Sequence, residues 1–178
     1  MSRRNLTLLL LFSPFMAWAL LDVFAARREI WRSLPDTFEA TRVGYIGSFA
    51  NGFGPGANET GFAVITLSED GALRIAKGGI PWLNIQPGGR LWPEWSATPV
   101  PRDDFWMGRP DSAAGAWPDP TVLAVLSRYG LRFDPPSEHQ TALDAALNAP
   151  GSFYAFGPGG LVAVIVPDAQ RAYVFYAG

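Results

Sequence analysis

Residues 62–76 read FAVITLSEDGALRIA, which is an apolar run, a short polar turn and a second run. Two runs separated by a turn that contains Asp-Gly form the sequence pattern of a β-hairpin, because Asp and Gly readily adopt the backbone angles of tight turns. This stretch therefore predicts two antiparallel strands, over residues 62–67 and 72–76.

A similar pattern returns near the C-terminus. Residues 161–166 are nearly all apolar, residues 167–170 read PDAQ, and residues 171–176 form another run. Upstream, the motifs GSF (47–49) and FGPG (53–56) return as GSF (151–153) and FGPG (156–159). Either this is a chance match among common strand and turn residues, or a three-strand meander has been duplicated. Both explanations give about six strands, and the runs without polar alternation are typical of strands buried on both faces.

Two helices are expected between these β segments. The first has Asp119 as N-cap and Gly130 just past its end. The second begins at Ser137, where Gln140 completes a capping box, and it ends before Pro150. The predicted fold class is α+β: a single N-terminal transmembrane helix, then one mainly antiparallel β domain with two short helices and a long Trp/Pro/Gly-rich loop. A duplicated three-strand meander is one of the two alternatives for the strands of this domain.

The N-terminal part carries a long apolar segment. Residues 6–26 read LTLLLLFSPFMAWALLDVFAA, and at about 1.5 Å per residue a helix of this length spans a bilayer core. The alternatives are a cleaved secretory signal and a retained transmembrane helix. Retention is favoured because the apolar part is longer than a signal core and Val23-Phe24-Ala25 is a weak cleavage site. Trp31, Arg27 and Arg28 are then expected at the membrane interface.

The arginines on the two sides of residues 6–26 are nearly balanced, and they slightly favour a signal anchor with its N-terminus in the cytoplasm. We therefore expect a single-pass protein of the bacterial inner membrane with most of the chain in the periplasm. The excess of arginine over lysine, with abundant Ala, Gly and Pro, is typical of a GC-rich bacterial genome. Residues 1–34 are expected to form the membrane anchor and its extension, and residues 35–178 one extramembrane domain.

Composition argues against several classes of function. The net charge is −2, so there is no basic field to attract nucleic acid. The chain has no cysteine, which excludes disulfides, thiolate metal sites and cysteine nucleophiles.

Candidate catalytic groups are also sparse. His139 is the only histidine and lies on the apolar face of a predicted helix, so packing or capping is favoured over catalysis. The glycine-rich segments 52–56 and 157–160 lack the lysine of a phosphate-binding loop. The carboxylates of Asp103, Asp104, Asp111 and Asp119 lack EF-hand spacing. We expect no enzyme activity, no cofactor and no metal.

The most distinctive segment is residues 78–118, with seven prolines, six glycines and five tryptophans in forty-one residues. We expect it to be an irregular Trp-rich loop. Its tryptophans could form a sugar-binding platform, a cluster folded over the core, or anchors in a protein interface. Interleaved arginines favour the interface. The predicted partner-binding residues are Trp82, Trp92, Trp95, Trp106, Trp117, Arg90, Arg102 and Arg109.

These observations favour an accessory, non-catalytic subunit of a large bacterial membrane complex of photosynthetic or respiratory type. Its expected partners are other subunits of that complex and the lipid bilayer. The alternative is a membrane-anchored extracytoplasmic module that binds a ligand or a glycan.

Overall fold

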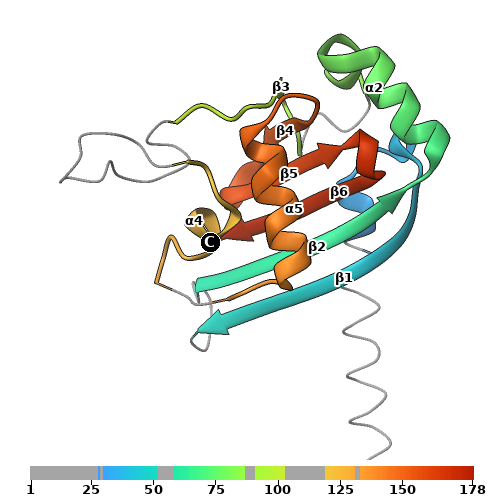
Figure 1. The fold of residues 1–178 in the computed structure, drawn as a ribbon. Helices are drawn as coiled ribbons and strands as arrows, with labels where there is room; N and C mark the ends of the chain where they lie inside the picture. Colours follow the sequence, from blue (N-terminus) through green and yellow to red (C-terminus); the bar gives the residue numbers. More distant parts are fainter. Residues whose placement is uncertain (1–27, 29, 52–57, 87–90, 103–118, 131–132) are drawn as a thin grey trace, which may run out of the picture.

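A six-stranded antiparallel sheet organises the domain, with strand order β1-β2-β6-β5-β4-β3 (Figure 1). The structure is a computed structural model that describes residues 28, 30–51, 58–86, 91–102, 119–130 and 133–178. The strands are β1 (Ala40–Asn51), β2 (Asn58–Leu67), β3 (Trp95–Ala97), β4 (Phe153–Phe156), β5 (Leu161–Val166) and β6 (Arg171–Ala177). The helices are α2 (Glu69–Leu83), α4 (Val122–Leu126) and α5 (Ser137–Asn148), with short 3₁₀ turns η1 (Asp36–Phe38), η2 (Pro158–Gly160) and η3 (Pro167–Ala169).

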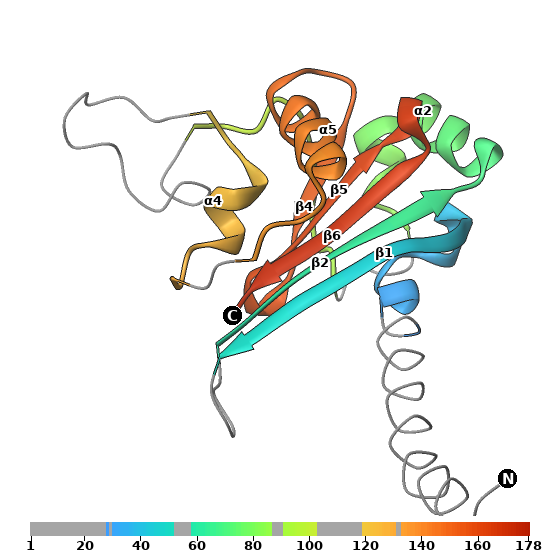
Figure 2. The same ribbon diagram turned by 60° about the horizontal axis from the view of Figure 1, so that its bottom comes forward.

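One face of the sheet packs against α4 and α5 (Figure 2). Phe62 and Val64 of β2 and Tyr173 and Phe175 of β6 point to this side, because alternate residues of a strand face opposite ways. Leu143 of α5 is fully buried against them. This face forms the first hydrophobic core.

The opposite face holds a second core. Ile65 of β2, Ile165 of β5 and Val174 of β6 are buried there, under α2, η1 and the chain between α2 and β3. Thus β2, β5 and β6 are apolar on both faces, as the continuous apolar runs in their sequence indicate.

The segment from Glu69 to Leu83 is a helix, and the predicted fold class is therefore wrong. Ser68 is the N-cap, since its Oγ accepts a hydrogen bond from the Gly71 backbone N–H at 2.9 Å. Ala72 and Ile75 are buried at helical spacing, whereas Leu73 between them is 48% exposed. The Ser-Glu-Asp-Gly sequence thus starts a helix with an acidic first turn instead of turning a hairpin.

The duplicated meander is also excluded by this helix. The third strand of the first repeat would be residues 72–76, which lie in α2, whereas residues 172–176 lie in β6. In the sheet, β6 pairs with both β2 and β5. The strand β6 therefore lies between β2 and β5 and is the neighbour of both. The sequence similarity does not reflect two equivalent three-strand units.

Part of the segment 78–118, which the sequence predicts to be irregular, lies in a helix and in a strand. Its first residues complete α2, which contains the non-helical Gly79 (φ 55°) and Pro81, and residues 95–97 form β3. The helices after this segment are α4, capped by Thr121, and α5, which follows Pro136.

The predicted transmembrane segment, residues 6–26, lies outside the described residues. Among the residues that the structure does describe, no helix has the length and apolar character needed to cross a bilayer. The fold that the structure supports is a six-stranded antiparallel sheet with a few helices.

Candidate functional site

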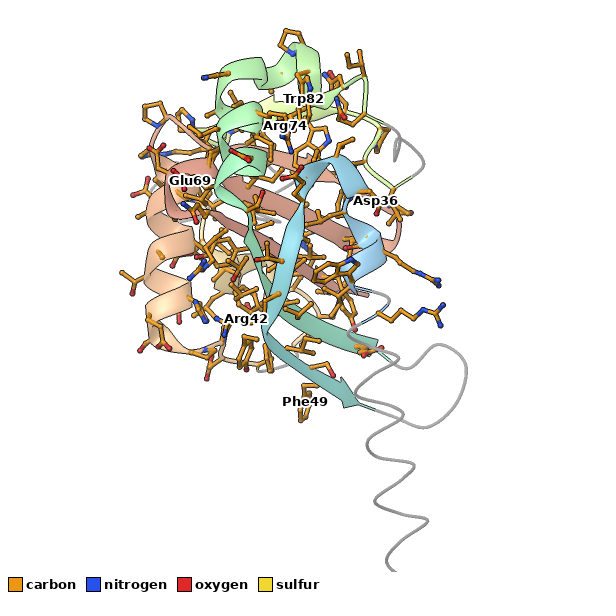
Figure 3. All side chains as sticks on the ribbon, turned by 90° about the vertical axis from the view of Figure 1, so that its right-hand side faces the viewer. Asp36, Arg42, Phe49, Glu69, Arg74 and Trp82 are labelled. Atoms are coloured by element: carbon orange, nitrogen blue, oxygen red, sulfur yellow. The ribbon has the colours of Figure 1, made fainter. Side chains whose placement is uncertain are left out.

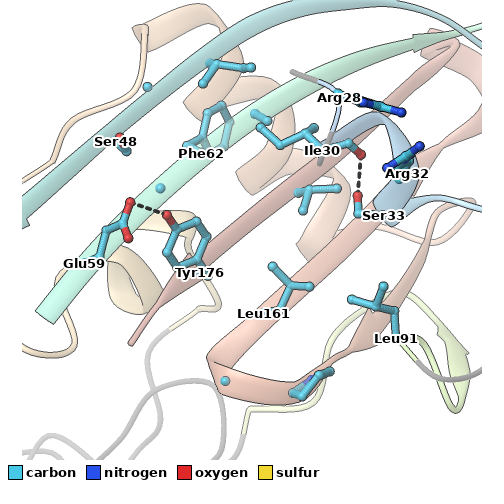
Figure 4. A pocket seen from close by; sticks show the side chains of 17 residues that line it. Arg28, Ile30, Arg32, Ser33, Ser48, Glu59, Phe62, Leu91, Leu161 and Tyr176 are labelled. Carbon is cyan, nitrogen blue, oxygen red and sulfur yellow. Dashed lines mark hydrogen bonds between the residues drawn. The ribbon is translucent and has the colours of Figure 1, made fainter. Parts of the chain in front are cut away.

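A groove lies on the second face of the sheet, between residues 28 and 30–33 on one side and strands β1, β2, β5 and β6 on the other (Figure 4). Its volume is about 870 Å³, within the range of sites that bind small molecules. Its lining includes Arg28, Ile30, Arg32, Ser48, Gly61 and Leu161. We call this cavity the sheet groove.

The floor of the sheet groove is formed by residues of β2 and β6, including Gly61, Ala63 and Tyr176. Gly61 of β2 lies beneath the Tyr176 ring, since a Cβ atom at this glycine would be 2.4 Å from Cε1 of that ring. The Tyr176 hydroxyl donates a hydrogen bond to Oε1 of Glu59 at 2.7 Å (Figure 4). The floor therefore ends in an ordered tyrosine–carboxylate pair.

The facing wall of the sheet groove is the helical turn at residues 30–33. The Ser33 hydroxyl donates to the Ile30 carbonyl at 2.6 Å, and the Trp92 indole N–H donates to the Ser33 carbonyl at 2.5 Å. Because Trp92 is 3% exposed, this bond ties the wall to the second core.

Two arginines stand at the rim of this wall. Arg28 and Arg32 are exposed, and four residues apart they lie on one side of a helical turn (Figure 4). Neither makes an ion pair with another side chain in the described part of the chain. Glu59 is the acidic residue of the lining and lies at the opposite end of the groove in Figure 4. The groove is thus basic at one end, apolar in the middle and acidic at the other.

The outer edge of β1 is a second surface with unused binding capacity. Within the described residues, β1 pairs only with β2 and stands at the edge of the sheet (Figure 3). Register shifts interrupt β1 between Ala40 and Tyr45, whereas residues 46–51 pair with β2 one for one. Phe49 in this regular half is 46% exposed. We call residues 46–51 the open edge of β1.

The tryptophans of residues 78–118 that the structure describes lie within the domain. Trp92 and Trp95 are 3% and 2% exposed, with ring centroids 5.9 Å apart, and Trp82 stacks on Phe38 at 5.9 Å. The core-cluster interpretation accounts for these three residues. Arg102 is exposed and forms an ion pair with Asp119. The partner-binding role of these residues stays a prediction.

Of the residues predicted at the membrane interface, Trp31 is 38% exposed and Arg28 lines the sheet groove. The other predicted site residues lie outside the described residues: Trp106, Trp117, Arg90, Arg109 and Arg27.

His139 packs against aromatic rings. Its ring centroid lies 6.0 Å from that of Tyr45 and 6.4 Å from that of Tyr173. Burial raises the pKa of Tyr173, which disfavours a phenolate at neutral pH. Within the described ranges, no group of three or more His, Cys, Asp or Glu side chains could hold a metal ion.

Sequence reasoning missed the sheet groove because its parts are far apart in the chain. Residues 28–33, Ser48, Gly61 and Tyr176 meet only through the strand order, in which β1, β2 and β6 are neighbours. The available signals were weak: a glycine inside the β2 run and two arginines with helical spacing.

Comparisons with known proteins give no relationship. No family model, no curated protein and no solved structure matches this chain.

Proposed function

We propose that this chain is a non-catalytic accessory subunit of a multi-subunit assembly in the bacterial inner membrane. A neighbouring subunit would add a strand to the open edge of β1. The observation that carries this proposal is the regular, uncharged backbone edge at residues 46–51. The photosynthetic or respiratory character of the assembly stays a prediction from the sequence.

The chemistry of an edge strand supports a strand as the partner. Alternate N–H and C=O groups of an edge strand point away from the sheet and are available to another chain. Natural proteins commonly block such edges with lysine, proline or bulges. In β1 the register shifts fall before Ile46, and residues 46–51 (IGSFAN) contain neither a charge nor a proline. Within the described residues, this half of β1 therefore carries none of these protections.

The exposed side chain of Phe49 supports the same site. It lies on the opposite side of β1 from Ser48, which lines the sheet groove. An apolar residue on an added strand could cover the Phe49 ring, and burial of aromatic area stabilises an interface.

Attachment at the membrane, with most of the chain in the periplasm, is proposed from the apolar residues 6–26. The chain just after them is tied to the domain by the hydrogen bond from Trp92 to the Ser33 carbonyl. A domain attached in this way would stay close to the bilayer and to other subunits in it.

The glycan-binding alternative has less support. It relied on an exposed aromatic platform, and Trp92 and Trp95 are nearly inaccessible. A sugar could not stack on these rings without opening the second core.

The test is a pair of charge substitutions at equally exposed apolar positions. Phe49→Lys places a cation on the open edge, and Leu73→Lys does the same on α2, where the side chain is 48% exposed. Native membranes are solubilised in mild detergent and the size of the complex is measured by blue-native electrophoresis. We expect wild type and Leu73→Lys to migrate in a large complex, and Phe49→Lys to migrate as the free chain.

Two outcomes contradict the proposal. One is a wild-type chain that migrates alone after mild solubilisation. The other is a Phe49→Lys chain that stays in the complex with an unchanged yield.

A further inference from the structure

The sheet groove has the shape and polarity of a site for a single acyl chain with an anionic head. We infer that it holds one acyl chain of an anionic phospholipid, with the phosphate against Arg28 and Arg32. This inference goes beyond the proposed subunit role, because it concerns a different face of the domain. It rests on the proposed membrane location only for the source of the ligand.

The volume and the lining favour a chain-like apolar ligand. The aliphatic side chains of Ile30, Leu91 and Leu161 line the groove of about 870 Å³. Its floor includes Ala63 and Val174, and the Tyr176 ring covers the backbone of Gly61. A slender methylene chain can lie along such a floor and bury its area against the aliphatic walls.

The charges fix the direction of the ligand. Arg28 and Arg32 offer guanidinium groups at one end, and guanidinium donors match phosphate oxygens in geometry and charge. At the other end Glu59 is negative and already accepts a hydrogen bond from Tyr176. An anionic head is therefore attracted to the arginine end and repelled from the Glu59 end.

The position of the arginine end favours a lipid of the bilayer as the source. Arg28 follows the apolar residues 6–26 almost directly in the sequence. If those residues lie in the membrane, the rim of the groove is at the level of the lipid headgroups, where arginines bind anionic lipids. A headgroup could bind at the rim while one of its chains enters the groove.

The experiment uses the purified full-length chain in a maltoside detergent and measures bound lipid by native mass spectrometry. The probe is lysophosphatidylglycerol, which has one chain and one anionic phosphate. Lysophosphatidylcholine tests the need for net negative charge, and glycerol 3-phosphate tests the need for the chain. We expect saturable binding of one lysophosphatidylglycerol, at least about tenfold weaker binding of the choline lipid, and no binding of glycerol 3-phosphate.

Two variants with matched controls locate the site. Ser48→Trp fills the groove from an exposed position of β1, and Phe49→Trp places the same side chain on the other side of the strand, where it replaces an exposed aromatic ring. Arg28→Gln with Arg32→Gln removes both rim charges, and Arg42→Gln removes an exposed β1 arginine that does not line the groove. Both site variants should weaken binding at least about tenfold, and neither control should change it.

The inference is overturned if Ser48→Trp and the double arginine variant bind the lyso-lipid as wild type does. It is also overturned if the choline lipid binds equally well, or if glycerol 3-phosphate alone binds as tightly. The double arginine variant is changed only at exposed positions, so it remains informative even if Ser48→Trp does not fold. Failure of the proposed subunit role appears separately, as a wild-type chain that migrates alone on blue-native electrophoresis.

Discussion

Gly71 sets how closely helix α2 approaches the turn before β1. A Cβ atom at this position would lie 2.4 Å from the Phe38 carbonyl oxygen, which is backbone and cannot rotate away. The missing side chain therefore allows the first turn of α2 to pack against η1 and cover the second core.

The first prediction is that Gly71→Ala destabilises the domain although alanine is the better helix former. The rearrangement that relieves the clash should lower the free energy of unfolding by about 1–3 kcal/mol. This loss exceeds the gain of up to about 1 kcal/mol from the higher helix propensity of alanine. The control is Gly44→Ala, whose Cβ would have its nearest neighbour at an ordinary 3.6 Å, from the Val64 carbonyl oxygen. Urea unfolding followed by tryptophan fluorescence measures both. An unfolding midpoint for Gly71→Ala at or above that of wild type would contradict this packing.

Asp144 links the two helices on the first face of the sheet. Its Oδ1 accepts a hydrogen bond from the Val122 backbone N–H at 2.7 Å, so a residue of α5 satisfies an N-terminal donor of α4. Burial raises the pKa of Asp144 and outweighs the lowering effect of this hydrogen bond. The folded state therefore holds the Asp144 proton more tightly than the unfolded state does.

The second prediction follows from the direction of this shift. As pH rises from the ordinary carboxyl value of 3.8 through the raised pKa, wild type loses stability relative to Asp144→Asn, because only wild type must then bury a charge. The asparagine keeps an oxygen for the Val122 N–H, whereas Asp144→Ala removes it and should cost roughly 0.5–2 kcal/mol. Urea midpoints from about pH 4 to about pH 7 measure the difference. If the urea midpoint of wild type rose relative to that of Asp144→Asn across this pH range, the pKa of Asp144 would not be raised in the folded state.

At the scale of elements, α2 shows how far the sequence alone could go. The apolar runs at residues 62–67 and 161–166 predict strands correctly, because β2 and β5 are buried on both faces. Residues 68–76 were misread because Ser-Glu-Asp-Gly suits both a hairpin turn and a helix N-terminus. The choice depends on Ile75 reaching the second core and on Ser68 bonding to Glu39 at 2.6 Å, both long-range contacts.

The contacts of Glu39 with the start of α2 also change the pKa of its carboxyl group. The Ser68 hydroxyl and the Arg74 guanidinium lower the pKa of Glu39, which is paired with Arg74 (Figure 3 labels this arginine).

The candidate surfaces are less predictable from the sequence than the strands, because the sheet groove and the open edge of β1 can be located only once the strand order is known.

The third prediction concerns the tryptophan-rich segment. If Trp92 belongs to the core, Trp92→Ala should destabilise the domain by about 3–5 kcal/mol, because it leaves a cavity beside Trp95 and removes the bond to the Ser33 carbonyl. Ile85→Ala is the control, since Ile85 is 76% exposed and should cost less than about 0.5 kcal/mol. Thermal unfolding of the full chain compares them. A Trp92→Ala chain with the melting temperature of wild type would favour the surface role predicted from the sequence.

At the scale of the whole molecule, the two edges of the sheet differ. The β3 edge is three residues long, whereas β1 is twelve residues long and its regular half is open within the described part of the chain. The sheet groove lies beside this half, since Ser48 and Ile46 line it. A subunit that adds a strand to β1 would therefore sit next to the proposed lipid.

The most direct test of the proposed role is amide hydrogen exchange at residues 46–51, measured in native membranes and in the purified free chain. In the free chain, no strand among the described residues pairs with the outward N–H groups of this edge, so they should exchange quickly. In the assembly we expect their exchange to be at least about tenfold slower, with unchanged exchange in β6, which is paired on both sides in either state. Equal exchange of residues 46–51 in both states would contradict the proposal that a neighbouring subunit completes the sheet at β1.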